Sequence, residues 1–231
     1  MHRKFLTVLA VAATALCLCG CFDLTQKVAL NRDGSGHYEI AVASTGIVGD
    51  ALKDADILSG TRGPVAKRTV IQNGRVTRTA STNFKNLSDL ALSDEAMSVT
   101  VKGRDLFGFG ATHAVFRRTF LVQNAKRAGE RRARNADDDT DNAVITSMFG
   151  DQTYTYSVTL PGSIEWIAPL NINGMAIKPR VTGDMFHGHT VTWRMPLGLL
   201  LSQKLLRYSI GFSVYGAVKE EQTTPSGSAA P

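Results

Sequence analysis

Two short turn motifs, each between stretches of alternating residues, constrain the fold of this chain more than any other feature. Asp33-Gly34 interrupts the alternating stretch 28–42, and Asn73-Gly74 separates 65–72 from 75–82. Glycine adopts positive φ without a steric penalty, and Asp and Asn tolerate it, so these dipeptides favour the tight turns of β-hairpins. The sequence therefore predicts antiparallel hairpins in the first third of the chain.

The rest of the chain shows more alternation than helical spacing. Helical spacing is confined to 46–58, to a single turn at 88–92 and to an apolar run at 197–206. Further short strands are expected at 97–102, 114–123, 153–160, 164–167, 175–181, 189–195 and 208–218, with a bend or bulge at 107–110. The pattern predicts an α+β fold: a mostly antiparallel, twisted β-sheet built from hairpins, with a few short helices packed on one side.

The 231 residues divide into a leader, one domain and a tail. The leader covers 1–20, the domain 21–219 and a polar tail, expected to be disordered, 220–231. Within the domain, 124–142 places five basic residues before four aspartates with almost nothing apolar. We expect this segment to be a mobile charged insert that divides the strands into two halves.

The leader has the composition of an export signal. A basic start, Met1 to Lys4, precedes a run from Phe5 to Leu18 that carries no charge. Fourteen residues are too few to span about 30 Å of hydrocarbon, but they match the apolar core of a signal peptide. An uncleaved membrane helix is the alternative, which the short run and Gly20 disfavour.

The residues that end the leader, Leu18-Cys19-Gly20-Cys21, resemble the lipobox of bacterial lipoproteins. The resemblance implies that a signal peptidase recognises Leu18, Cys19 and Gly20, that the chain is cut before Cys21, and that the Cys21 sulfur carries lipid. Such a protein is attached to a membrane of the cell envelope by its N-terminal lipid, with the mature domain outside the cytoplasm. Which membrane holds it stays open. The alternative, a metal site made of Cys17, Cys19 and Cys21, lacks a nearby His or carboxylate.

The cysteines and the charge exclude several classes of function. All three cysteines lie in the first 21 residues, so the later chain has no disulfide and no thiolate chemistry. The formal charge of +6 is modest and dispersed. It suits solubility and an anionic membrane surface better than nucleic acid, which is not an expected partner.

Candidate catalytic or metal-binding motifs are few. His187-Gly188-His189 has the spacing of two imidazoles on one face of a strand, but zinc needs three or four ligands, and Gly183 to Gly188 has the composition of a hairpin tip. The acidic run Asp137 to Asp141 lacks the Gly and Glu of a calcium-binding EF-hand loop. No nucleophile elbow, phosphate-binding loop or dinucleotide-binding loop occurs. We therefore expect no catalytic residue, no metal and no cofactor, and hence no enzyme.

Several segments together resemble the LppM-like envelope lipoproteins. They are Cys21, 31–36 (Asn-Arg-Asp-Gly-Ser-Gly), 154–162 (Tyr-Thr-Tyr-Ser-Val-Thr-Leu-Pro-Gly) and 191–197 (Val-Thr-Trp-Arg-Met-Pro-Leu). The resemblance implies an α+β lipoprotein domain with lipid-related binding, and it supplies no catalytic residues.

Three functional hypotheses follow. The first is a noncatalytic binding module at the membrane, for a lipid or other apolar ligand or for an envelope protein. It predicts an apolar cavity of ligand size, and its motivation is the set of aromatic residues in the predicted strands, Phe116, Phe120, Tyr154, Tyr156, Trp166, Trp193, Phe212 and Tyr215. The alternatives are an envelope hydrolase that uses His187 or His189, and a structural or assembly lipoprotein.

Overall fold

The computed structural model describes residues 22–58, 61–90, 92, 95–105, 110–121, 152–184, 188–203 and 205–222, with the backbone alone at 121, 221 and 222. The leader with Leu18, Cys19, Gly20 and Cys21 lies outside these residues. So do the charged insert 124–142, the predicted bend except for Gly110, and His187. The predictions made for them stay predictions.

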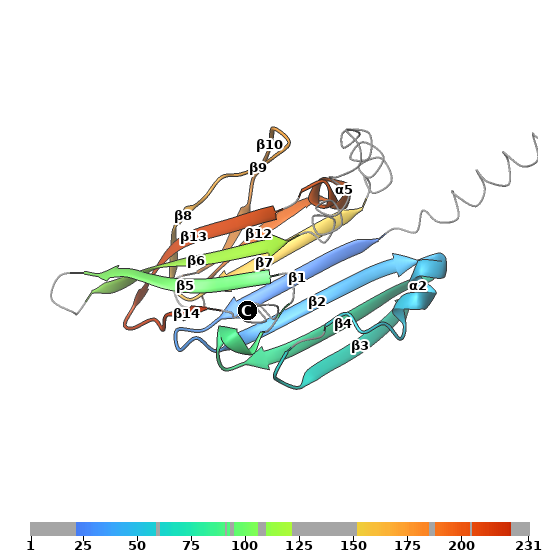
Figure 1. Ribbon diagram of the computed structural model, residues 1–231, viewed down its shortest axis with the longest axis horizontal. Helices are drawn as coiled ribbons and strands as arrows, with labels where there is room; N and C mark the ends of the chain where they lie inside the picture. The colour runs from blue at the N-terminus through green and yellow to red at the C-terminus, as the bar shows by residue number, and fades with distance from the viewer. Residues whose placement is uncertain are drawn as a thin grey trace, which may run out of the picture.

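The first sheet has seven strands in the order β11-β12-β7-β1-β2-β4-β3 (Figure 1). Its strands are β1 (Asp23–Leu30), β2 (Gly36–Thr45), β3 (Val65–Gln72), β4 (Arg75–Phe84), β7 (Thr153–Leu160), β11 (Arg180–Asp184) and β12 (Gly188–Pro196). Neighbours are antiparallel except for β1 and β7, which pair in parallel, so the sheet is mixed. A parallel pair needs a long connection, and more than a hundred residues separate these two strands.

Both predicted hairpins are confirmed. The turn between β3 and β4 places Asn73 at φ 51° and Gly74 at φ 74°, the left-handed values that a type I′ turn requires. In the turn between β1 and β2, Gly34 has φ 83°. The strand expected at 175–181 is split, because Pro179 has no N–H to donate to a sheet. The strand β10 ends before it and β11 begins after it.

The second sheet has five strands in the order β14-β5-β6-β13-β8. They are β5 (Glu95–Arg104), β6 (Ala111–Leu121), β8 (Ser163–Ile167), β13 (Leu205–Tyr215) and β14 (Glu221–Gln222), and a separate two-stranded pair joins β9 (Leu170–Ile172) to β10 (Met175–Ile177). Glu220 to Gln222, the first residues of the predicted tail, contact this sheet. Glu220 accepts a hydrogen bond from the Val101 N–H (2.8 Å), and β14 pairs with β5.

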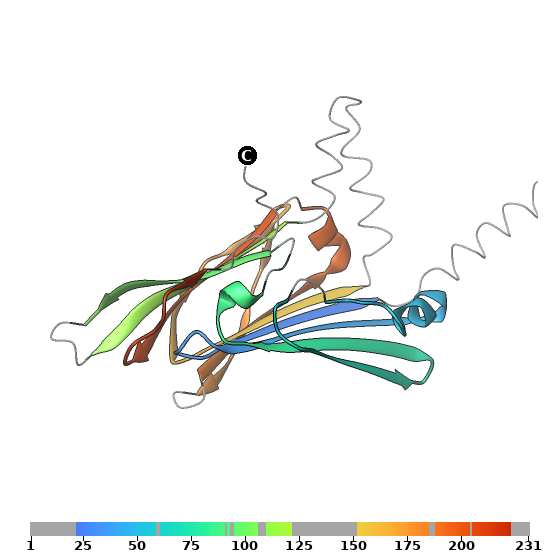
Figure 2. The same cartoon turned by 60° about the horizontal axis from the view of Figure 1, so that its bottom comes forward.

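The two sheets form two layers around a shared core (Figure 2). Every second residue of β7, from Tyr154 to Leu160, is fully buried, and so are alternate residues of β13. This period of two is what a strand shows when one of its faces packs against a second sheet. The side chains of β7 and β13 belong to the same apolar cluster.

The helices of the described residues are few and short, as predicted, but the sheet is not covered by them. They are α2 (Gly46–Leu52), α5 (Leu197–Leu201) and the 3₁₀ turn η1 (Leu87–Asp89), all shorter than the spacing predicts. The second sheet covers the first instead, because its alternating apolar residues also need a buried face. Within the described ranges, no helix combines the length and apolar character needed to cross a bilayer.

Candidate functional site

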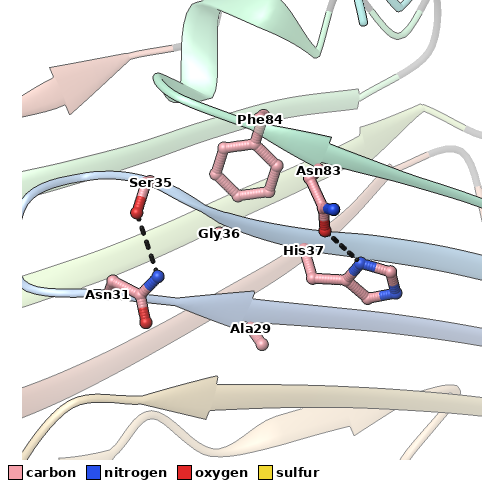
Figure 3. Close-up of a pocket in the computed structure, with 7 residues that line it drawn as sticks. All are labelled: Ala29, Asn31, Ser35, Gly36, His37, Asn83 and Phe84. Carbon is pink, nitrogen blue, oxygen red and sulfur yellow. Dashed lines mark hydrogen bonds between the residues drawn. The ribbon is translucent and has the colours of Figure 1, made fainter. Parts of the chain in front are cut away.

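An open hollow lies at the end of the first sheet where the turn between β1 and β2 meets the end of β4 (Figure 3). Its volume is about 360 Å³, and its lining consists of Ala29, Asn31, Ser35, Gly36, His37, Asn83 and Phe84. Four of these residues offer hydrogen-bonding side chains, and Phe84 offers an aromatic ring. None of the candidate residues predicted from the sequence lines it, so this site emerges from the tertiary structure.

The rim of the hollow is a well-braced turn. The Asn31 N–H donates to the Ser35 carbonyl (2.8 Å), and the Gly34 N–H donates to the Asn31 carbonyl (3.2 Å). The Asp33 carboxylate accepts from the Ser35 hydroxyl (2.6 Å) and from its amide (3.0 Å). These two hydrogen bonds, the hydroxyl first, hold the pKa of Asp33 below its usual value. The turn is therefore held in one conformation.

The C-terminal segment fastens this rim to the second sheet. The guanidinium of Arg32 donates to the Tyr215 carbonyl (2.9 Å), and the Lys219 N–H donates to the Arg32 carbonyl (3.1 Å). The Lys219 ammonium reaches the Asn86 side chain (2.5 Å) just after β4. The rim thus contacts the C-terminal segment directly and is linked through Lys219 to the residues after β4.

Gly36 forms the floor of the hollow, where the side chain of Phe84 crosses the backbone. A Cβ at position 36 would lie 2.1 Å from the Ala29 carbonyl oxygen and 2.5 Å from Cζ of Phe84. Such distances are far inside van der Waals contact, so a side chain here displaces either the ring or the strand. Glycine at this position is what allows the ring to reach the floor.

The imidazole of His37 and the amide of Asn83 form one wall. The two residues face each other across β2 and β4, and His37 Nδ1 lies 2.8 Å from Asn83 Oδ1. An amide oxygen only accepts, so Nδ1 carries the proton, and in the neutral ring Nε2 is then an acceptor. On the opposite wall, the Asn31 amide donates to the Ser35 hydroxyl (2.9 Å). The hollow therefore offers donors and acceptors for recognising a polar group.

A second polar cluster lies buried between the two sheets around Arg118. Its side chain is fully buried, and its Nε and Nη2 lie 3.0 Å and 2.7 Å from the two oxygens of Glu95. Nη1 donates to the Tyr154 hydroxyl (2.9 Å), and Nη2 donates to Gln26 Oε1 (2.5 Å). Gln26 in turn donates to Glu95 (2.8 Å). Arg118 on β6 is thus joined to both β1 and β7 of the other sheet.

Aromatic rings enclose this ion pair. The guanidinium carbon of Arg118 lies 4.0 Å from the ring centre of Tyr156 and 5.6 Å from that of Tyr208, which is cation–π geometry. Trp193 stacks on Tyr156, with their centroids 5.8 Å apart. The side chains of Tyr156, Trp193 and Tyr208 have no hydrogen-bond partner for their polar atoms among the described residues. Burial raises the pKa of all the tyrosines here, Tyr38, Tyr154, Tyr156 and Tyr208.

Burial disfavours the charge of Arg118, but the attraction of Glu95 outweighs it and holds the pKa of Arg118 above its ordinary value. The cluster is closed and its ion pair is satisfied, so we regard it as part of the core. The same holds for most of the aromatic residues that motivated a binding surface. Of these, Trp166 (46% exposed) and Tyr215 (71% exposed) are the two that reach solvent substantially.

A third cluster, on the outer surface of the second sheet, places His113 between two carboxylates. His113 Nε2 lies 2.9 Å from Asp105, and Nδ1 lies 2.5 Å from Glu165. The contact with Asp105 and then that with Glu165 raise the pKa of His113, and the same histidine lowers the pKa of Asp105. Both ring nitrogens donate to carboxylates, so neither is free to act as a general base. The arrangement is an ion bridge between β6 and β8.

Of the two weak candidates for a metal site, the structure describes His189 and not His187. His189 is half-buried at the start of β12, and its Nδ1 lies 2.7 Å from the Gly162 carbonyl rather than beside a carboxylate. Across the parts of the chain that the structure describes, no three His, Cys, Asp or Glu side chains are grouped so as to hold a metal ion. Sequence reasoning missed His37, His113 and Arg118, because each acquires its partners through pairing of distant strands.

The comparisons with known proteins find similarity among solved structures alone. No protein-family model matches the chain, and no curated protein matches it. Among solved structures, the NMR structure of the folded domain of LppM from Mycobacterium tuberculosis is similar, at 13% identity and a TM-score of 0.41. The match covers 85% of this chain and 92% of that one.

Proposed function

We propose that this protein is a cell-envelope lipoprotein, acylated at Cys21, whose folded domain is a noncatalytic binding module with the hollow as its ligand site. The observation that carries the proposal is the construction of the hollow. Hydrogen-bonding groups from the turn at 31–35 and from β2 and β4 surround an aromatic ring, and the rim is fastened by the C-terminal segment. Side chains that are held in place in this way bind with little loss of conformational entropy.

The position of the hollow suits a domain that is tethered by its N-terminus. The strand β1 runs for eight residues from Asp23 to Leu30. At about 3.3 Å per residue, its two ends are roughly 23 Å apart. Asp23 is two residues from the predicted anchor, whereas Ala29 and Asn31 line the hollow. A ligand site at the Leu30 end of β1 would face away from the membrane and be open to solvent.

The lining favours a polar ligand of modest size. A volume of about 360 Å³ is near the lower end of the roughly 300–1,000 Å³ that ligand pockets occupy. It suits a lipid headgroup or a fragment of similar size better than an acyl chain. This revises the expectation of a purely apolar cavity, because the large aromatic side chains between the sheets pack against one another and Arg118.

Native mass spectrometry of the full-length protein, expressed in a bacterium and extracted in mild detergent, tests both parts of the proposal. The mass of the N-terminal peptide reports acylation, which Cys21→Ser should abolish. A retained small molecule should be lost in His37→Ala and in Asn83→Ala, and should persist in Thr79→Ala, a matched control on the same face of β4. An adduct that survives both site variants rules out the hollow. A retained protein in place of a small molecule favours the assembly alternative.

A further inference from the structure

The end of the domain at which the chain enters carries exposed apolar side chains. Ile47 in the first turn of α2 is 71% exposed, Ile71 near the end of β3 is 59% exposed, and its neighbour Val70 is 39% exposed. Single exposed apolar residues are ordinary on a soluble protein. Here the location is what matters, since α2 and the end of β3 lie at the end of the sheet where β1 begins (Figure 1).

Strand register establishes this location. Asp23 pairs with Ala43, Ala43 pairs with Thr77, and Thr77 pairs with Val70, so one row crosses the sheet from β1 to β3. Ile71 is one residue further along β3 in the same direction. The strand β2 continues two residues past Ala43 and leads directly into α2, which brings Ile47 to this end as well.

The predicted anchor leaves no spacer between this end and the lipid. Phe22 is partly buried and packs against the apolar cluster of Val42, Leu52 and Val76 beneath α2. Cys21 is its covalent neighbour, and consecutive Cα atoms are about 3.8 Å apart. A lipid on Cys21 that inserts in a bilayer therefore brings Phe22 close to the headgroups, and the end of the sheet that surrounds Phe22 comes with it.

The charged side chains of this corner are compatible with such contact. Lys53 pairs with Asp50 (2.7 Å), Lys67 pairs with Asp56 (3.1 Å), and Arg75 pairs with Asp23. These pairs neutralise Asp50, Asp56 and Asp23, and leave the exposed Asp54 as the carboxylate of this corner outside the three pairs. Long basic side chains also reach sideways to lipid phosphates while their stems cover apolar surface.

We propose that the corner defined by Ile47, Val70 and Ile71 rests in the headgroup region of the bilayer that holds the lipid anchor. The contact fixes the orientation of the domain, so that β1 points away from the membrane and the hollow lies at its distal end. This inference rests on the proposed acylation of Cys21. It adds a protein surface to the lipid anchor, and membrane binding strengthens with the apolar area that is buried in the headgroup region.

The test uses the full-length, acylated protein in vesicles of phosphatidylethanolamine and phosphatidylglycerol. No cysteine follows Cys21 in the sequence, so Ile47→Cys introduces one thiol for a fluorescent probe. Tyr215→Cys is the matched control, because Tyr215 is also 71% exposed but lies beside the turn at Arg32, at the opposite end. Ile71→Cys is a second test position.

A quencher attached to lipid headgroups should quench the probe at 47 and at 71 at least roughly threefold more strongly than at 215, as expected for side chains in the headgroup layer. Equal quenching at all three positions, or none at 47, would overturn the proposal. A probe at 47 that is shielded from water but not quenched by lipid would show that a protein covers the corner, which also overturns it. Flotation of the vesicles reports the anchor separately: protein that does not float refutes acylation, and protein that floats without quenching at 47 refutes only the docking surface.

Discussion

The buried ion pair between Arg118 and Glu95 makes the sharpest prediction about stability. Arg118→Met retains much of the side-chain volume but removes the charge. The carboxylate of Glu95 would then be left buried without a countercharge, and Tyr154 and Gln26 would each lose the hydrogen bond that Arg118 donates. Removing one partner of a buried ion pair costs about 3–5 kcal/mol. We expect a loss in the free energy of unfolding of that size.

Urea unfolding, followed by far-ultraviolet circular dichroism, measures the effect. With a denaturant slope of about 2 kcal/mol per molar urea, the midpoint should fall by roughly 2 M.

A double variant provides the control. Arg118→Met combined with Glu95→Leu removes both charges, and such replacements are often neutral or stabilising. We expect it to recover about half or more of the loss seen in the single variant. A single variant that loses less than about 1 kcal/mol, the range of an exposed pair, would show that water reaches Arg118. A double variant no more stable than the single one would refute the electrostatic reasoning.

Three further substitutions probe other contacts. Gly36→Ala places a Cβ against the backbone and against Phe84, so the urea midpoint should fall by the equivalent of about 1–3 kcal/mol; an unchanged midpoint would contradict the close approach. The pKa of His113 is raised, so its ion bridge stabilises the fold below the ordinary histidine pKa and is lost as the pH rises through the raised value. The melting temperature should therefore fall as the pH rises through this range, and His113→Gln should abolish the fall. A variant that keeps the fall would show that another group causes it. Gly211→Ala should displace the Trp166 indole, whose Nε1 would lie 2.1 Å from the new Cβ, and shift its fluorescence; an unshifted spectrum argues against the contact.

Local chemistry explains which elements could be predicted. The Asn73-Gly74 turn adopts the left-handed conformation that its residues favour, and the strands on either side begin and end close to where the alternation predicts. The alternation at 153–160 likewise gives β7 with the predicted bounds. These features depend on residues a few positions apart, so the sequence carries them directly.

The helical predictions failed where local spacing competed with a sheet. The spacing at 46–58 continues beyond Leu52, but α2 ends there, and its two glycines are poor helix formers. The apolar run at 197–206 was expected to be one helix. Instead, α5 ends at Leu201, and Leu205 already pairs with Leu121 on β6. Pairing along eleven residues of β13 outweighs a weak local preference for helix.

The sequence by itself determined the hairpins and the positions of most strands, because turn chemistry and alternation are properties of neighbouring residues. The leader and the lipid site at Cys21 stay predictions. The tertiary structure alone decided that β1 and β7 pair in parallel, that a second sheet covers the first, and that Arg118 is buried against Glu95. It also brought His37 to Asn83, across 46 positions of the chain. Such pairings depend on the free energy of the whole packed core, in which burying the apolar faces of two sheets offsets the cost of enclosing a charge.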